Sequence, residues 1–354
     1  MEGNQIGNKY ANFSDYESTR RVFSIFSYII LCIRGCLGWI GIDTLALTLL
    51  LNLCIIISID YKRVNKSFLL IPLFCILLFI NKQILGVIDL IAMSLILKKE
   101  KFHVLVKIYA FILVCFIPIW LFLLYNGYIV SERWFDPNKG GAFFDYGFNN
   151  PNGLGIFGFN IISMVFLLSL HRNLWRSLII TLLVNQVFFV ISSCRTAWIG
   201  GLVMALCILI SMFHGFKNWM RYPLAILPPV IMIALIYLST HCTNFIELDV
   251  LFSGRLSIYG SILNNMSILN WILGTKLPDG PMDGSYMMLF FIGGMIVALF
   301  YWILNFRLMI SSFDRIKPYL PFVLSVMACG IMETTFSSCG GLSLLYWYLL
   351  LNLK

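Results

Sequence analysis

Long runs of apolar residues follow one another through most of this chain, and they limit what it can fold into. A helix needs about 20 mostly apolar residues to cross a bilayer. Of the 354 residues, 60% are hydrophobic and only 12% are charged, whereas soluble domains carry about 25% charged residues. The chain cannot cover a water-facing surface, which excludes a soluble enzyme, a nucleic-acid-binding protein and a disordered protein.

Apolar segments predict an all-α polytopic membrane protein with about 12 transmembrane helices in one membrane domain, residues 1–354. No Pro-rich or Ser-rich linker divides the chain, and the polar residues 1–21 predict an N-terminal tail without a signal-peptide cleavage site. Alternatively, the segments 67–81 and 84–97 enter the membrane and return to the same side without crossing it. Because two crossings are then lost together, all other segments keep their orientation. The segments are 22–40, 43–59, 67–81, 84–97, 102–124, 153–170, 177–193, 196–213, 223–240, 286–306, 319–334 and 340–353.

The distribution of Lys and Arg orients these segments, because short cytoplasmic loops carry an excess of both. With the N-terminus inside, 17 of the 25 Lys and Arg lie in inner segments and six lie in outer loops. The other two, Arg34 and Lys107, lie within apolar segments. Both termini are therefore expected on the cytoplasmic side, and the positive net charge indicates membrane orientation rather than nucleic-acid binding.

Two connections in this topology are long, about 125–152 and about 241–285, and both face outward. Long loops in a compact domain are usually functional. The first ends in Asn150-Pro151-Asn152-Gly153. This run is typical of a helix cap beside aromatic membrane anchors, and alternatively offers the amides of Asn150 and Asn152 to a sugar.

Arg195 lies between two apolar segments, in Ser193-Cys194-Arg195-Thr196. An Arg at membrane depth is costly unless it reaches the surface or an anion, and a helix N-terminus favours negative charge. Two interpretations stay open. The guanidinium binds a phosphate through paired hydrogen bonds, or it contacts lipid headgroups at the interface.

The second outer loop contains Arg255 on a predicted amphipathic helix that presents this residue inward. Asp283 directly precedes the tenth segment, as a general base or as a helix cap. Glu333, near the outer end of the eleventh segment, is a functional candidate at membrane depth or an ion-pair partner of one of the arginines. The apolar positions of the predicted helix are Leu251, Phe252, Leu256, Ile258, Tyr259 and Ile262.

Several kinds of cofactor site are missing from the sequence. It contains no Walker loop for ATP and no Asp-x-Asp pair for a metal-bound nucleotide sugar. Of the four His, only His241 lies in an outer loop, and the ten Cys show no metal-ligand spacing. No metal and no cofactor are therefore expected.

The order of these outer motifs resembles the bacterial O-antigen and capsule repeat-unit polymerases of the Wzy type, which are relatives of the O-antigen ligases. The motifs cover about 140–335, and the rest of the chain resembles the family only by hydropathy. The motifs are Phe148–Gly155, Ser193–Thr196, Ser253-Gly254-Arg255-Leu256, Gly274 and Asp283-Gly284-Ser285-Tyr286.

The resemblance implies a GT-C-like, metal-independent glycosyltransferase of the bacterial cytoplasmic membrane. It implies that the growing glycan moves from undecaprenyl pyrophosphate to the next lipid-linked unit on the outer face, with a flippase and a chain-length regulator as partners. Arg195 and Arg255 match Arg positions of the family and would hold the pyrophosphate. Asp283 or Glu333 is the expected base, with His241 and Asp249 behind them.

The expected substrate-binding residues are Asn150, Asn152, Ser253, Tyr286 and His241. The nearest alternative is a ligase, which transfers the finished chain to a different acceptor. Ligases carry an important His in the large outer loop, but His241 lies very early in that loop. A transporter, namely a flippase for lipid-linked oligosaccharides, is the alternative outside the enzymes. It is disfavoured because a flippase needs charged residues along a cavity through the membrane, and few charged residues lie within the apolar segments.

Overall fold

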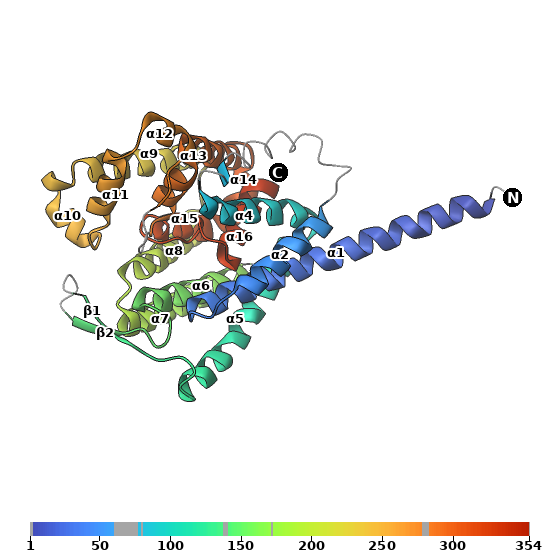
Figure 1. The fold of residues 1–354 in the computed structure, drawn as a ribbon, viewed down its shortest axis with the longest axis horizontal. Helices are drawn as coiled ribbons and strands as arrows, with labels where there is room; N and C mark the ends of the chain where they lie inside the picture. The colour runs from blue at the N-terminus through green and yellow to red at the C-terminus, as the bar shows by residue number, and fades with distance from the viewer. Residues whose placement is uncertain are drawn as a thin grey trace.

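The computed structural model describes residues 3–59, 77–78, 81–136, 141–170, 173–277 and 283–353. In this part of the chain the fold is a bundle of helices with one two-stranded hairpin (Figure 1). The longer helices are α1 (Gly3–Trp39), α5 (Phe102–Tyr125), α6 (Pro151–Ser169), α7 (Leu174–Ser192), α8 (Arg195–Phe213), α9 (Arg221–Thr240) and α13 (Ser285–Ser311). The shorter elements are α2 (Leu45–Ser58), α4 (Leu85–Ile96), β1 (Arg133–Asp136), β2 (Gly141–Phe144), α10 (Ile246–Leu251), α11 (Arg255–Asn264), α12 (Ile268–Leu273), α14 (Phe313–Ile316), α15 (Leu320–Cys329) and α16 (Gly341–Asn352).

Seven helices among the described residues are long and apolar enough to cross a membrane. The expectation of about 12 spans is not confirmed. The predicted segments 43–59, 84–97, 319–334 and 340–353 form helices of only 14, 12, 10 and 12 residues. These helices are shorter than the 30 Å hydrocarbon core, since each residue adds about 1.5 Å. The segment 67–81 lies almost entirely outside the described residues.

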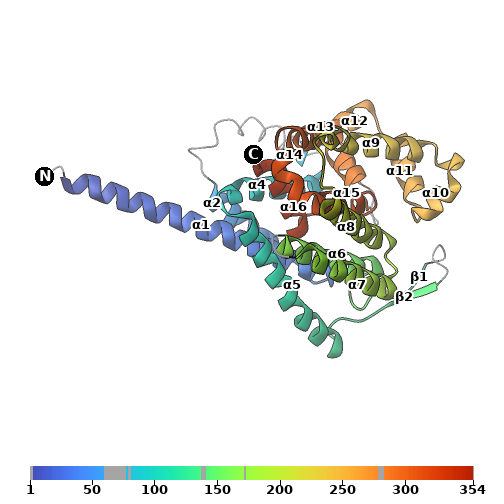
Figure 2. The ribbon, with the colours of Figure 1, turned by 180° about the vertical axis from the view of Figure 1, so that it is seen from behind.

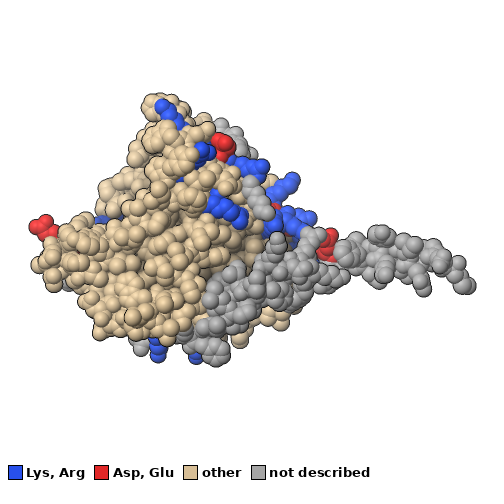
Figure 3. Space-filling view, turned by 90° about the horizontal axis from the view of Figure 1, so that it is seen from above, with Lys and Arg blue, Asp and Glu red and all other residues tan. Residues whose placement is uncertain are grey.

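Apolar stripes on the outside of the bundle show where lipid contacts the protein. On α7, Ile179, Leu183, Val187 and Val190 recur at helical spacing and are 54–70% exposed. A water-soluble protein rarely exposes a continuous apolar patch of this kind. The space-filling view shows the same property as a broad surface without charged side chains (Figure 3). The chain is therefore a multi-pass membrane protein.

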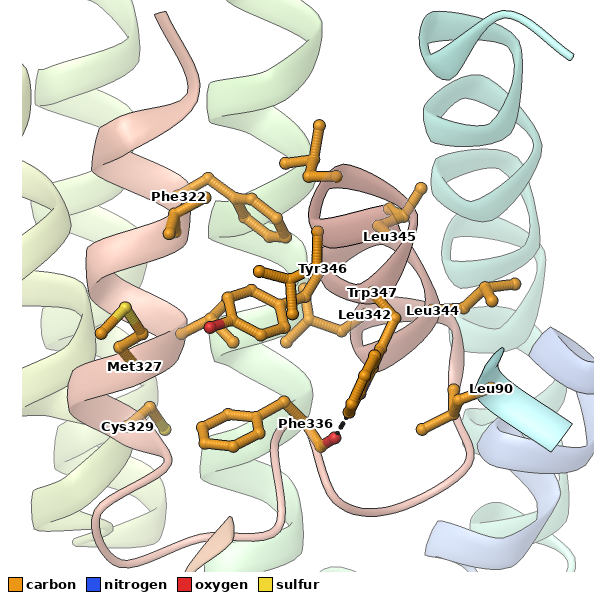
Figure 4. Packing of buried hydrophobic residues seen from close by; sticks show 14 of the residues in the cluster. Leu90, Phe322, Met327, Cys329, Phe336, Leu342, Leu344, Leu345, Tyr346 and Trp347 are labelled. Atoms are coloured by element: carbon orange, nitrogen blue, oxygen red, sulfur yellow. Dashed lines mark hydrogen bonds between the residues drawn. The ribbon is translucent and has the colours of Figure 1, made fainter. Parts of the chain in front are cut away.

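The tightest part of the core lies around α16 and the connection that precedes it. Trp347 is fully buried, and its indole N–H donates to the carbonyl of Phe336 at 2.8 Å. Phe336 folds back into the bundle (Figure 4), where its ring stacks on Tyr301 with centroids 5.2 Å apart. The connection 330–340 is thereby held in the core, and it carries Glu333.

Both termini lie at the same end of the bundle. The carboxylate of Glu100 pairs with Arg21 of α1 at 2.7 Å, and the backbone carbonyl of Glu100 accepts a hydrogen bond from Tyr348 of α16. The hairpin, α10 and α11 lie at the end opposite the N-terminus (Figures 1 and 2). We call that opposite end the loop end, because both long predicted loops lie there.

Helix α13 is interrupted at Gly294, and the chain that follows α12 packs into the break. Gly294 has φ +59° and ψ −161°, values that do not continue a helix. The amide of Thr275 donates to the carbonyl of Phe291 at 2.7 Å, so a carbonyl freed by the break keeps a partner. A Cβ on Gly274 would lie 2.7 Å from that same oxygen. Glycine on both sides therefore lets the two backbones touch.

Gly294→Ala is expected to force these two segments apart. The added Cβ would overlap the carbonyl of Ile272, and the backbone conformation is unfavourable for alanine. Overpacking and strain together predict a loss of about 2–4 kcal/mol. The measurement is the melting temperature of the purified protein in detergent, compared with Gly38→Ala, where a Cβ meets no atom within 4 Å. Equal melting temperatures for the two variants would contradict the contact.

Arg34 of α1 and Asp89 of α4 are charged residues inside the bundle. Asp89 is 3% exposed and forms no hydrogen bond or ion pair with any residue that the structure describes. Arg34 lies within electrostatic reach of Asp89, and one of its buried terminal nitrogens has no hydrogen-bond partner in the described part of the chain. The two charges therefore compensate each other at a distance.

Removing one of these charges is expected to destabilise the protein more than removing both. Asp89→Leu leaves Arg34 without a compensating charge inside the bundle, and an uncompensated buried charge destabilises the folded state. The double variant Arg34→Leu/Asp89→Leu should recover most of that loss. Thermal denaturation of the three proteins in detergent measures the effect. A double variant that is less stable than Asp89→Leu would show that the charges act independently.

Candidate functional site

At the loop end, the guanidinium of Arg255 lies between two carboxylates that come from distant parts of the chain. One terminal nitrogen of Arg255 lies 2.7 Å from Oδ2 of Asp283 and 3.4 Å from Oε1 of Glu333. The side chains of Arg255, Asp283 and Glu333 are 13%, 32% and 7% exposed. We call these three residues the charged cluster. Asp283 is its most accessible member.

Helix α11 places Arg255 at the cluster. Ser253 and Gly254 adopt positive φ angles of 56° and 77°, which turn the chain sharply so that α11 begins at Arg255. Leu256, Tyr259 and Leu263 form its buried face. The prediction holds in part: Arg255 lies inward on a helix, but the single helix expected around it is divided into α10, which ends at Leu251, and α11. Two positions assigned to its apolar face, Leu251 and Ile258, are instead 55% and 39% exposed.

Asp283 reaches the cluster from the segment that leads into α13. Gly284, not Asp283, is the residue that caps α13, and no side chain caps this helix. The carboxylate of Asp283 is therefore used for Arg255 rather than as a cap. The hydroxyl of Tyr259 donates to the backbone carbonyl of Asp283, which fixes this segment against α11.

Glu333 is held in place by the first residue of α13. The amide of Ser285 donates to the carbonyls of Gly330 and Glu333 at 2.7 and 3.0 Å, and its hydroxyl donates to the Glu333 carbonyl at 2.8 Å. That hydroxyl also accepts from the amide of Phe336 at 3.0 Å. Both elements that carry carboxylates of the cluster are thus joined through one side chain.

Ser285 and Tyr259 are positioning residues that sequence reasoning missed. Tyr259 lies four residues after Arg255, a spacing that puts both on one face of a helix. That signal was available in the sequence. Ser285 belongs to the motif Asp283-Gly284-Ser285-Tyr286, but only the structure shows that its bonds cross to 330–336.

Charge around Arg255 keeps the guanidinium protonated. Burial alone would lower the pKa of Arg255, but the charges of Glu333 and Asp283 outweigh burial, so the pKa is raised above its ordinary value. Burial raises the pKa of the Tyr259 phenol, against the lowering effect of Arg255. One cation and two carboxylates leave the cluster with a surplus negative charge when both acids are ionised. One carboxylate can therefore accept a proton while the other still compensates Arg255.

Arg195 lies at the same end, as the first residue of α8. Ser193 has φ 50° and ends α7, so the chain reverses there and α8 begins two residues later. Cys194 and Glu333 both lie within electrostatic reach of Cys329, the last residue of α15. The N-terminus of α8 and the charged cluster therefore border the same part of the bundle.

Four of the predicted substrate-binding residues lie at three different places in the chain, at the start of α6, before α11 and at the end of α9. Asn150 caps α6 by accepting from the amide of Gly153 at 2.8 Å, as the cap interpretation predicts. Asn152 lies half-buried in the first turn of α6, and Ser253 lies in the turn before Arg255. His241 is exposed at the end of α9, where its Nδ1 lies 3.0 Å from the Tyr237 carbonyl.

Tyr286 requires a correction. Its side chain is fully buried, with its ring against Phe336 and Tyr301 at centroid distances of 5.0 and 6.2 Å. The first turn of α13 directs this residue into the bundle, whereas Asp283 three residues earlier reaches the charged cluster. A surface contact between Tyr286 and a sugar or phosphate is therefore wrong for this structure.

The other side chains that could bind a metal ion do not form a cluster in the described part of the chain. Among the described residues, no group of three or more His, Cys, Asp or Glu side chains could hold a metal ion, and no disulfide joins the cysteines of this part of the chain. In comparisons with known proteins, no family model, no curated protein and no solved structure matches the chain. The function therefore has to be argued from the charged cluster and its position.

Proposed function

We propose that this protein polymerises lipid-linked oligosaccharide repeat units during synthesis of a capsule, O-antigen or exopolysaccharide. The observation that supports this most is the Arg255 guanidinium held between Asp283 and Glu333 at one end of a multi-pass helical bundle. A buried cation suits a phosphate leaving group. An adjacent, partly exposed carboxylate suits deprotonation of a hydroxyl.

In the proposed reaction, the acceptor hydroxyl oxygen forms a bond to the anomeric carbon of the donor glycan. The bond from that carbon to the phosphate oxygen breaks, and its electron pair leaves with undecaprenyl pyrophosphate. The hydroxyl proton passes to a carboxylate. Because the phosphate ester already carries the energy of transfer, no nucleotide enters the reaction.

The two carboxylates have different exposures, which supports different roles for them. Asp283 is 32% exposed and would accept the proton from a bound hydroxyl. Glu333 is 7% exposed, and its backbone is tied to Ser285, so it orients and compensates Arg255. Arg195, at the N-terminus of a neighbouring helix, would share the pyrophosphate charge with Arg255.

The proposal includes a location. The loop end would face the outside of the bacterial cytoplasmic membrane, with both termini in the cytoplasm, as the distribution of Lys and Arg predicts. A flippase would deliver the lipid-linked units to this face, and a chain-length regulator would act with the polymerase. Membrane lipid surrounds the apolar stripes of the bundle.

Reconstitution tests the proposed function directly. The purified protein in proteoliposomes would receive undecaprenyl-pyrophosphate-linked repeat units, and the products would be separated by size. A ladder of lipid-linked multimers is expected from the wild-type protein. Transfer only to a different added acceptor would indicate a ligase. Movement of single units between leaflets without any ladder would indicate a flippase, and both results would overturn the proposal.

A further inference from the structure

A hollow lies between the end of α11 and the chain that follows α12. Its volume is about 470 Å³, which falls within the usual range for small-ligand sites of 300–1,000 Å³. The side chains of Ile262, Met266 and Leu277 provide its apolar lining. We call this hollow the α11 pocket.

The other lining residues of the α11 pocket are polar. Ser261, Asn265 and Thr275 supply hydroxyl and amide groups, and Lys276 supplies an ammonium group. Lys276 is exposed and forms no hydrogen bond or ion pair with any residue that the structure describes. None of the described lining residues is a carboxylate. These residues combine an apolar patch, neutral hydrogen-bonding groups and one ammonium group.

The walls of the α11 pocket are fixed to the membrane bundle. Thr275 donates its amide to Phe291 in the break of α13, and its carbonyl accepts from the side-chain amide of Asn81 at 2.9 Å. Lys276 therefore follows a residue whose amide and carbonyl are both hydrogen-bonded to the bundle. A pocket with such fixed walls does not need to be ordered when a ligand binds.

The α11 pocket and the charged cluster share one helix. Ile262 lies seven residues after Arg255 on α11, and seven residues of helix rise by about 10 Å. Seven residues are also close to two full turns, so the two side chains project from nearly the same face. A short oligosaccharide that has its reacting end at Arg255 would reach the pocket along the exposed edge of this face, past Ile258, which is 39% exposed.

We infer that the α11 pocket is a subsite for a sugar a few residues away from the bond being formed, and that this sugar carries a carboxylate. The apolar patch would take the C–H face of the ring, the hydroxyl and amide groups would bind its hydroxyls, and Lys276 would pair with its acid group. This inference rests on the proposed function for the identity of the glycan. The pocket itself is argued from its lining alone.

Two matched disaccharides test the inference without requiring polymerisation. Cellobiouronic acid and cellobiose differ only in that one terminal sugar is a uronic acid. Saturation-transfer NMR would measure the binding of each to the protein in phosphatidylcholine nanodiscs. We expect at least a tenfold preference for the acid. Lys276→Met should abolish the preference and Lys276→Arg should keep it, while Lys82→Met, an exposed lysine outside the pocket, should change nothing.

Each other outcome is informative. Equal binding of the two disaccharides, no binding, or a preference that survives Lys276→Met would overturn the inference. A preference lost in nanodiscs that contain phosphatidylglycerol would assign the pocket to a lipid headgroup instead. If the Lys276-dependent preference holds but reconstitution gives no ladder, the proposed function fails and the acidic subsite remains. If a ladder forms but Lys276 has no effect on binding, the inference alone fails.

Discussion

Arg255→Ala is expected to abolish multimer formation while leaving the protein folded in the membrane. The change removes the cation that would stabilise the departing pyrophosphate, and removing one such preorganised group costs about 10²–10³ in rate. It also leaves Asp283 and Glu333 facing each other without their shared partner. The initial rate of multimer formation in proteoliposomes measures the effect, and at least a 100-fold loss is expected.

Two control variants distinguish the loss of the Arg255 guanidinium from the loss of any positive charge at this end of the bundle. Arg255→Lys keeps a positive charge but cannot donate through a planar fork, so an intermediate rate is expected. Arg133→Ala removes an exposed arginine of β1 at the same end of the bundle and should leave the rate unchanged. A rate for Arg255→Ala within a few-fold of wild type, at equal membrane levels, would remove Arg255 from the site.

Asp283→Asn is expected to lower kcat by about 10²–10⁴, the usual contribution of a general base. Asparagine has nearly the same shape and keeps a hydrogen-bonding oxygen near Arg255, but it cannot accept the hydroxyl proton. KM for the lipid-linked unit should therefore change little. A kcat for Asp283→Asn within a few-fold of wild type, at equal membrane levels, would exclude Asp283 as the base.

Glu333→Gln is the matched control for that result. Because Glu333 is nearly buried and held by Ser285, its loss should disturb the position of Arg255 and so raise KM, with a smaller loss of kcat than Asp283→Asn. If Glu333→Gln lowers kcat with KM unchanged and Asp283→Asn does not, the two roles are exchanged. If neither variant lowers kcat, the base lies outside the charged cluster.

Much of the charged cluster could be predicted from the sequence. Arg255 on an inward helix face, Asp283 before a membrane helix and Glu333 as partner of an arginine all follow from periodicity and from the cost of charge in lipid. The structure joins the three through two ion pairs. What periodicity could not supply was Ser285, because its bonds connect residues 48 positions apart.

Hydropathy was less reliable for the extent of the helices. The predicted segment 319–334 is apolar almost throughout, yet α15 ends at Cys329 because the chain turns to bury Phe336. An apolar turn held inside the bundle has the same composition as the end of a span. The break in α13 at Gly294 could not be predicted from hydropathy either, because it depends on contact with the backbone after α12.

The most direct test of the proposed function is the size of the lipid-linked glycans in the host strain when its own gene is replaced by Arg255→Ala. Membranes with equal levels of the wild-type and variant proteins would be compared, and the leaflet that holds each glycan would be determined. We predict single repeat units on undecaprenyl pyrophosphate in the outer leaflet, without longer chains. Long lipid-linked chains that never reach their final acceptor, or single units confined to the inner leaflet, would contradict a polymerase.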